Sequence, residues 1–168
     1  MGLDLIFARR SIRQFTGEAV SPEQERELLC AAMAAPSARN MKPWHFIIIR
    51  ERATLDAIAE AHPFASMLGE ASLCIAVLGD PAVYGDYWIL DCSAATQNIL
   101  LAATAQGLGA CWLGMHPREE RKAAIRPLLG IPDEMEILSL VAIGHPAETK
   151  EPRSQYDAGR VHSERWSP

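Results

Sequence analysis

Residues 36–46, which read PSARNMKPWHF, mark the point where a helical pattern gives way to a strand-like one. The helical run stops at Pro36, because proline disfavours the helical conformation in the residue before it. An apolar run rich in isoleucine, typical of a strand, begins at His45. The loop between them carries hydroxyl, amide and ammonium groups, and loops between two rigid elements often bind ligands. By itself the segment is compatible with a plain connection or with a binding loop.

Outward from this loop, the apolar pattern predicts a mixture of helices and strands. Ser21, Pro22 and Gln24 form the start of a helix, since serine can cap, proline fits the first position and glutamine completes a capping box. The apolar run 72–79 indicates a strand covered on both faces, and 86–106 indicates a buried central helix ended by glycine. The remaining expected elements are helices at 3–12, 22–34, 52–60 and 117–128, and strands at 45–50, 110–113 and 136–143. This order predicts a layered α/β or α+β domain.

The composition indicates one globular domain over residues 1–168, with 49% hydrophobic and 22% charged residues. A net charge of -5 argues against a nucleic-acid coat. No apolar run is long enough to span a membrane, and the first residues lack a secretory pattern. Cys30, Cys74, Cys92 and Cys111 are scattered without metal-ligand spacing, which favours buried free thiols in a cytoplasmic protein.

Two basic clusters lie at opposite ends of the chain. Arg9, Ser11 and Arg13 surround the expected end of the first helix, where Arg9 and Arg13 would share a face. Lys150 and Arg153 follow in a polar segment. Guanidinium forks and a hydroxyl suit a phosphate dianion, although a basic helix end that complements the helix dipole would look the same. The clusters therefore predict either an anion site or solvated charge.

The run 109–114 carries a glycine at each end of a short expected strand. Glycine permits a flat ligand to approach the backbone closely, but a cap and a turn would also explain it. Asp91 and Cys92 in the central helix favour a buried polar pair over a nucleophile. No side chain is assigned a catalytic role.

Together these stretches resemble the nitroreductase family of flavoproteins. The resemblance rests on five motifs that occur in the family's order along nearly the whole chain. They are RRSIRQF at 9–15, PSARN with PWHF at 36–46, QNILLAA at 97–103, GLG with WLG at 107–114, and IGHP at 143–146 followed by the basic tail. The chain looks like a short member of this family.

The resemblance implies an α+β fold of three layers, with a mostly antiparallel central sheet flanked by helices and two chains intertwined as a homodimer. It implies FMN at the subunit interface and a C-terminal arm, residues 145–168, that packs on the partner. Arg13 would lie near the flavin pyrimidine. The implied phosphate contacts are Arg9, Ser11, Lys150 and Arg153, with Arg10 adjacent. The implied ring contacts are Cys111, Trp112, Leu113 and Gly114, together with Pro36, Ser37, Ala38 and Asn40 of the partner subunit.

The implied activity is ping-pong transfer of hydride from NADH or NADPH, through flavin N5, to an electron-poor acceptor such as a nitroaromatic or a quinone. Arg13 would stabilise the anionic reduced flavin at N1. The same fold could instead serve a reductive dehalogenase, a flavin-consuming enzyme or a non-enzymatic FMN-binding protein. The small-molecule acceptor is left open at this point.

Overall fold

The computed structural model describes residues 2–166, and its secondary structure follows the expected order closely. Its four strands and six α-helices are joined by three short 3-10 turns among these residues. The elements in chain order are α1 Asp4–Ala8, α2 Pro22–Met33, η1 Ala38–Asn40, β1 Trp44–Ile49, α3 Arg52–Ala61, η2 Ser66–Gly69, β2 Leu73–Gly79, α4 Pro81–Tyr84, α5 Tyr87–Ala105, β3 Gly109–Gly114, α6 Glu119–Leu129, β4 Glu136–Gly144 and η3 Ala158–Arg160. The capping box at Ser21 and Gln24 is formed as predicted.

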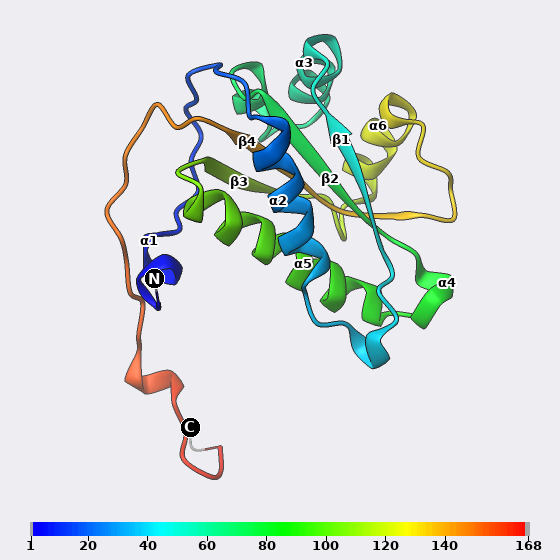
Figure 1. Cartoon of the computed structure of the whole chain (residues 1–168). Helices are drawn as coiled ribbons and strands as arrows, with labels where there is room; N and C mark the ends of the chain where they lie inside the picture. The colour runs from blue at the N-terminus through cyan, green and yellow to red at the C-terminus, as the bar shows by residue number, and fades with distance from the viewer. Residues whose placement is uncertain (1, 167–168) are drawn as a thin grey trace.

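The strands form one sheet in the order β1-β2-β4-β3, and all three pairings are antiparallel. Successive residues of β2 face opposite layers: Cys74 and Ala76 pack with α3 and α6, whereas Ile75 and Val77 pack with α2 and α5. Every residue of β2 is buried, as its uninterrupted apolar run predicted. Figure 1 shows α2 and α5 crossing one face of the sheet. The predicted three-layer α+β fold is confirmed.

The first helix is shorter than the predicted 3–12, because α1 ends at Ala8 and Arg9 is already extended. Beyond it the chain pairs with the edge of the sheet: the Ile12 N–H donates to Ala110 O at 3.0 Å, and Ser11 forms a bridge with Ala110. The expectation that Arg9 and Arg13 share a helical face is therefore wrong.

Glycines explain how closely this segment packs. A Cβ added to Gly109 would lie 2.7 Å from a methyl carbon of Ile12, so no side chain fits there. The close approach at Gly109 thus serves packing within the chain, not a ligand. Gly107, at φ 73°, ends α5 in the left-handed conformation that glycine tolerates.

Two expectations about burial need correction. The central helix α5 is not buried all round: the Leu90 side chain is 65% exposed and Tyr87 is exposed beside it. Cys30 is exposed on α2, whereas the other three cysteines are buried free thiols as predicted. Both exposures occur because α2 and α5 form the outer layer on their side of the sheet, with nothing from the described residues 2–166 covering them.

The C-terminal tail has no core of its own. After β4 it runs along the N-terminal segment and then leaves the body of the chain (Figure 1). Tyr156 and Trp166 are 78% and 80% exposed. Within residues 2–166 no helix is long and apolar enough to cross a membrane.

Candidate functional site

A small basic cavity lies where the segment after α1 meets the start of the tail. It has a volume of about 180 Å³ and is lined by Arg10, Ser11, Arg13, Lys150 and Arg153. Arg9 is not part of this lining, because it is the extended residue that ends α1. Four cations around one small volume, with no carboxylate in the lining, suit a ligand that carries at least two negative charges.

Glu148 links the two chain segments that form this basic cavity. The Arg13 backbone N–H donates to Glu148 Oε1 at 2.6 Å, and Lys150 Nζ lies 3.0 Å from the same oxygen. These contacts, that of Arg13 first, hold the pKa of the Glu148 carboxyl below its ordinary value. Lys150 Nζ also donates to Ser11 O at 2.7 Å. The two basic clusters therefore meet in space, as the anion-site interpretation requires.

The tail is tied down as far as Arg153. Arg10 Nη1 donates to Glu151 O, and the Arg153 N–H donates to Phe7 O at 3.1 Å. An Arg10 side chain held in this way closes the rim of the basic cavity. Sequence spacing could not show how Arg10 and the tail enclose the basic cavity, because their arrangement depends on contacts between the two ends of the chain.

A second cavity, the strand-edge cavity, lies beside the first along β3. Its volume is about 260 Å³, and its lining residues are Arg13, His62, Phe64, Cys111, Trp112, Leu113, Gly114 and Arg121. Arg13 lines both cavities, so the two are neighbours separated by this side chain. The structure thus brings the predicted ring-contacting strand next to the predicted phosphate contacts.

The outer edge of β3, which does not face β4, presents backbone N–H and C=O groups to this cavity. Ala110 O accepts from the Ile12 N–H, and Gly114 O accepts from Arg121 Nη1 at 2.8 Å. Backbone groups two residues apart on a strand point the same way, so the N–H and C=O of Trp112 also face this edge. Past Ala110 no further strand among residues 2–166 pairs with it. A flat ligand with polar edges could bind here without displacing any strand.

Sequence reasoning missed three residues of the strand-edge cavity: His62, Phe64 and Arg121. His62 follows α3, Phe64 lies in the turn after it, and Arg121 belongs to the first turns of α6. Arg121 lies over the Phe64 ring, 5.2 Å from its centroid. No motif marked them, because they come from two elements that meet only through packing on the sheet.

His62 is an uncharged part of this wall. Its side chain is 1% exposed, and Nδ1 accepts from the Phe64 N–H at 3.2 Å. Burial lowers the pKa of His62; a backbone contact at Gly114 opposes this, and the nearby Arg121 cation adds to the lowering. The imidazole is therefore neutral at pH 7.

This lowered pKa predicts an acid-sensitive stability. An unfolded chain protonates this imidazole near about pH 6.5, whereas the folded chain does so only at lower pH. Below that value the unfolded state binds more protons, so the free energy of unfolding falls as the pH decreases. Chemical denaturation between pH 5 and 8 should show a shallower acid slope for His62→Gln than for the natural protein. The matched variant at exposed His45, His45→Gln, should keep the natural slope, and equal slopes for all three proteins would contradict the assignment.

The loop 36–42 lies elsewhere in the chain. Asp91, buried on α5, accepts the Ala38 N–H on Oδ1 at 3.0 Å, and the Lys42 N–H donates to Ser37 Oγ at 3.1 Å. Arg39 and Asn40 are left-handed, at φ 52° and 61°. Asp91 is thus the buried polar group that was predicted, holding the loop in an irregular shape. Burial raises the pKa of neighbouring Cys92 to about 12, which excludes a thiolate nucleophile at neutral pH.

The loop and the basic cavity lie at opposite ends of α5. Asp91 holds the loop near the start of the helix, whereas Thr104, near its end, lines a hollow together with Arg10 and Lys150. A rise of about 1.5 Å per residue separates Asp91 from Thr104 by roughly 20 Å. Pro36, Ser37, Ala38 and Asn40 line neither the basic cavity nor the strand-edge cavity of their own chain.

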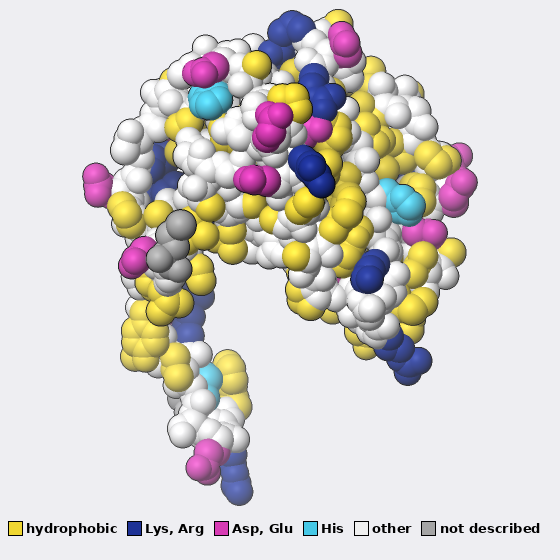
Figure 2. Space-filling view, in the orientation of Figure 1, with side chains coloured by type: hydrophobic (Ala, Val, Ile, Leu, Met, Phe, Trp, Pro, Cys, Tyr) yellow, Lys and Arg dark blue, Asp and Glu magenta, His cyan; other side chains and the backbone are white. Residues whose placement is uncertain are grey.

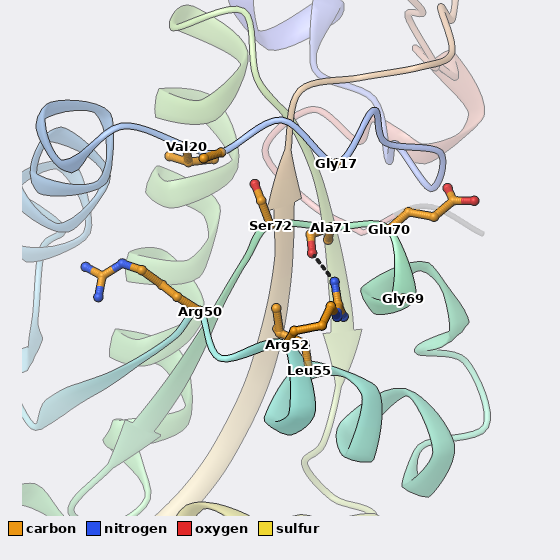
Figure 3. A pocket seen from close by; sticks show the side chains of 10 residues that line it. Gly17, Val20, Arg50, Arg52, Leu55, Gly69, Glu70, Ala71 and Ser72 are labelled. Atoms are coloured by element: carbon orange, nitrogen blue, oxygen red, sulfur yellow. Dashed lines mark hydrogen bonds between the residues drawn. The ribbon is translucent and has the colours of Figure 1, made fainter.

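Another cavity, of about 480 Å³, is distinct from this site and lies between the segment after Phe15 and the start of β2. Figure 3 shows Arg52 reaching the Ala71 carbonyl, a hydrogen bond of 3.0 Å. Arg50 pairs with Glu25, and Glu70 accepts the Phe15 N–H at 3.3 Å. Because its charged groups are already engaged by the protein, this cavity is a weaker candidate than the two neighbouring cavities along β3.

A layered α+β fold with a basic cavity beside an open strand edge suits a flat, anionic ligand that binds outside the sheet. Comparisons with known proteins point to a single family. The "Nitroreductase family" matches residues 6–63 and 61–145. A protein of Archaeoglobus fulgidus called "Putative NADH dehydrogenase/NAD(P)H nitroreductase" is 46% identical over 170 residues, which cover 98% of each chain. The chain belongs to the nitroreductase family.

Solved structures agree with this assignment. A protein of Parabacteroides distasonis with the same description is 40% identical, with a TM-score of 0.95 over 98% of each chain. An "FMN-dependent Nitroreductase" from Clostridium difficile is 28% identical, with a TM-score of 0.92 over 98% of this chain and 99% of that one. The fold therefore extends over the whole length of these relatives.

Proposed function

We propose that this protein is an FMN-dependent oxidoreductase that uses NADH or NADPH to reduce an electron-poor acceptor, such as a nitroaromatic or a quinone, by a ping-pong route. When bound, FMN supplies the hydride acceptor and donor at its N5 position. The observation that carries the proposal is that the basic cavity and the strand-edge cavity adjoin at Arg13, which lines both. One end suits a phosphate and the other suits a flat ring, in the order in which FMN carries them.

The residues of the basic cavity fit a terminal phosphate. A phosphate monoester carries a charge of about −2 at neutral pH, and charge-assisted hydrogen bonds to it are the strongest kind available to side chains. Arg10, Arg13, Lys150 and Arg153 supply the cations, and Ser11 supplies a hydroxyl. Contacts with the tail already hold Arg10 and Lys150 near the cavity, so less side-chain ordering is needed on binding.

The strand-edge cavity fits the flavin ring. The outward N–H groups of Trp112 and Gly114 can donate to polar atoms on the ring's edge, and their positions are set by the β3–β4 pairing. Arg13, at the junction of the two cavities, places a positive charge beside the ring and favours negative charge that develops there. No side chain is assigned a proton-transfer role.

A homodimer with two FMN sites at the subunit interface completes this proposal. The loop 36–42 lines neither cavity of its own chain, and we propose that it lines the flavin bound to a second copy. Hydrophobic side chains gather on the α2 and α5 face and along the tail, as Figure 2 shows. Leu90, Tyr156 and Trp166 are large exposed examples. Residues 145–168 are proposed to pack on the partner as a C-terminal arm.

The direct test is to identify the flavin and measure turnover. Freshly purified protein is expected to be yellow and, when denatured, to release FMN in equimolar amount with the chain. Oxidation of NADH or NADPH should then depend on an added nitroaromatic or quinone. Release of FAD, or of no flavin, would contradict the cofactor assignment. Bound FMN without oxidation of NADH or NADPH would favour a non-enzymatic FMN-binding protein. Turnover only with halogenated or flavin substrates would favour a reductive dehalogenase or a flavin-consuming enzyme.

A further inference from the structure

Arg121 is a cation of the strand-edge cavity that no carboxylate neutralises. None of the ion pairs among residues 2–166 includes it, although its neighbour Lys122 is paired with both Glu119 and Glu136. Its Nη1 donates to Gly114 O at 2.8 Å, which fixes the guanidinium at the end of β3. Arginine carries five N–H donors in a planar fork, so this one contact leaves donors free for a ligand.

The wall beside Arg121 is formed by Phe64 and His62, which carry no charge. The Phe64 ring lies beneath the guanidinium at 5.2 Å, and Phe64 is itself well exposed to solvent. His62 is buried with a lowered pKa and carries no charge at neutral pH. The wall thus offers an aromatic surface beside a positive charge, which is the combination that recognises an aromatic ring bearing an anionic group.

Arg121 and Arg13 occupy different places in the site. Arg13 lines both cavities, whereas Arg121 lines only the strand-edge cavity and does not belong to the basic cavity. A phosphate bound in the basic cavity therefore leaves Arg121 uncompensated. Arg121 is therefore available to pair with a negative charge on a molecule other than the cofactor.

We propose that the acceptor of this enzyme is a flat aromatic compound that carries an anionic substituent, such as a carboxylate, and that Arg121 binds that substituent while Phe64 contacts the ring. This inference rests on the proposed function, whose acceptor it specifies. For a nitroaromatic acceptor the reaction is R–NO₂ + NAD(P)H + H⁺ → R–NO + NAD(P)⁺ + H₂O. The nicotinamide is oxidised by two electrons, the nitro group is reduced by two, and its lost oxygen leaves as water.

The first experiment compares two acceptors of similar shape, 4-nitrobenzoate and its neutral methyl ester, with the holoenzyme. Because the ester is the more electron-poor of the two, the kcat/KM of each variant is taken relative to that of natural protein with the same compound. Arg121→Gln should lower the value for 4-nitrobenzoate by about 10-fold, the effect of losing one partly solvated charge-assisted contact, and leave that for the ester unchanged. Arg121→Lys, which keeps the charge but not the fork, should show a smaller loss with 4-nitrobenzoate. Arg118→Gln, at the exposed arginine that immediately precedes the same helix, should behave as the natural protein.

A binding measurement gives a readout that does not depend on turnover. Calorimetry with benzoate and benzamide, which are not reduced, should show tighter binding of benzoate to natural holoprotein and no such preference in Arg121→Gln. Flavin content should be the same in both proteins.

The two proposals fail in different ways. Equal losses for both nitro compounds, or equal affinity for benzoate and benzamide in natural protein, would overturn the anionic acceptor and leave the proposed function intact. Selective benzoate binding by a protein that oxidises no nicotinamide would support the anion site and refute the proposed function. Loss of flavin in Arg121→Gln and Arg121→Lys together would mean that Arg121 binds the cofactor, and would also overturn the inference.

Discussion

Ending the chain after Gly144 is expected to give a colourless protein that aggregates. This cut removes Lys150 and Arg153, two of the four cations that line the basic cavity. It also removes Glu148, which accepts the Arg13 N–H, and the contact between the Ala147 N–H and Gln14 O at 2.9 Å. Losing two charge-assisted contacts at roughly 1.5–3 kcal/mol each weakens flavin binding by about 10²- to 10⁴-fold. Absorbance of the purified protein measures the flavin, and light scattering measures aggregation.

A cut after Ser154 is the matched control, because it keeps every residue of the basic cavity and removes only residues 155–168. This shorter deletion should still bind FMN but dimerise less tightly, since it lacks Tyr156 and Trp166. The full-length variant Lys150→Met separates charge from folding: it should lose flavin affinity while remaining dimeric. If the cut after Gly144 stays yellow and dimeric, the tail is only an appendage. If the chain cut after Ser154 dimerises as tightly as the full chain, residues 155–168 have no role at the interface.

Much of the fold could be predicted from local patterns. The capping box at Ser21 starts α2, and the apolar run of β2 is buried on both faces. The left-handed Gly107 ends α5 as expected. These features are set by neighbouring residues or by a period that one element displays alone, so they are visible before the chain folds.

The failures share a physical cause, which is competition from contacts distant in sequence. The first helix was predicted over residues 3–12, but backbone pairing of Ile12 with Ala110 extends the chain after Ala8. The strand-edge cavity was half predicted, through β3 and Arg13. Its other half, including Phe64 and Arg121, depends on how α3 and α6 pack on the sheet, and no spacing reports that packing.

Leu90→Glu is expected to convert the proposed dimer to a monomer and, with it, to remove the flavin. Leu90 is 65% exposed on α5, the helix that also holds loop 36–42 through Asp91. Burying a leucine contributes about 1.5–3 kcal/mol, and a symmetric interface contains two copies, so their loss alone raises the dimer Kd roughly 10²- to 10⁴-fold. Burying the new carboxylate would cost more.

Leu128→Glu is the matched control for this substitution, since Leu128 is another exposed leucine but lies on α6, across the sheet from α5. It should leave both the dimer and the flavin intact. Sedimentation measures the assembly, and absorbance measures the flavin in the same samples. Because we propose that the partner's loop lines the flavin across the α5 face, monomer formation and flavin loss should occur together. A yellow Leu90→Glu monomer would show that one chain binds FMN unaided, and a Leu90→Glu dimer would place the interface on another face.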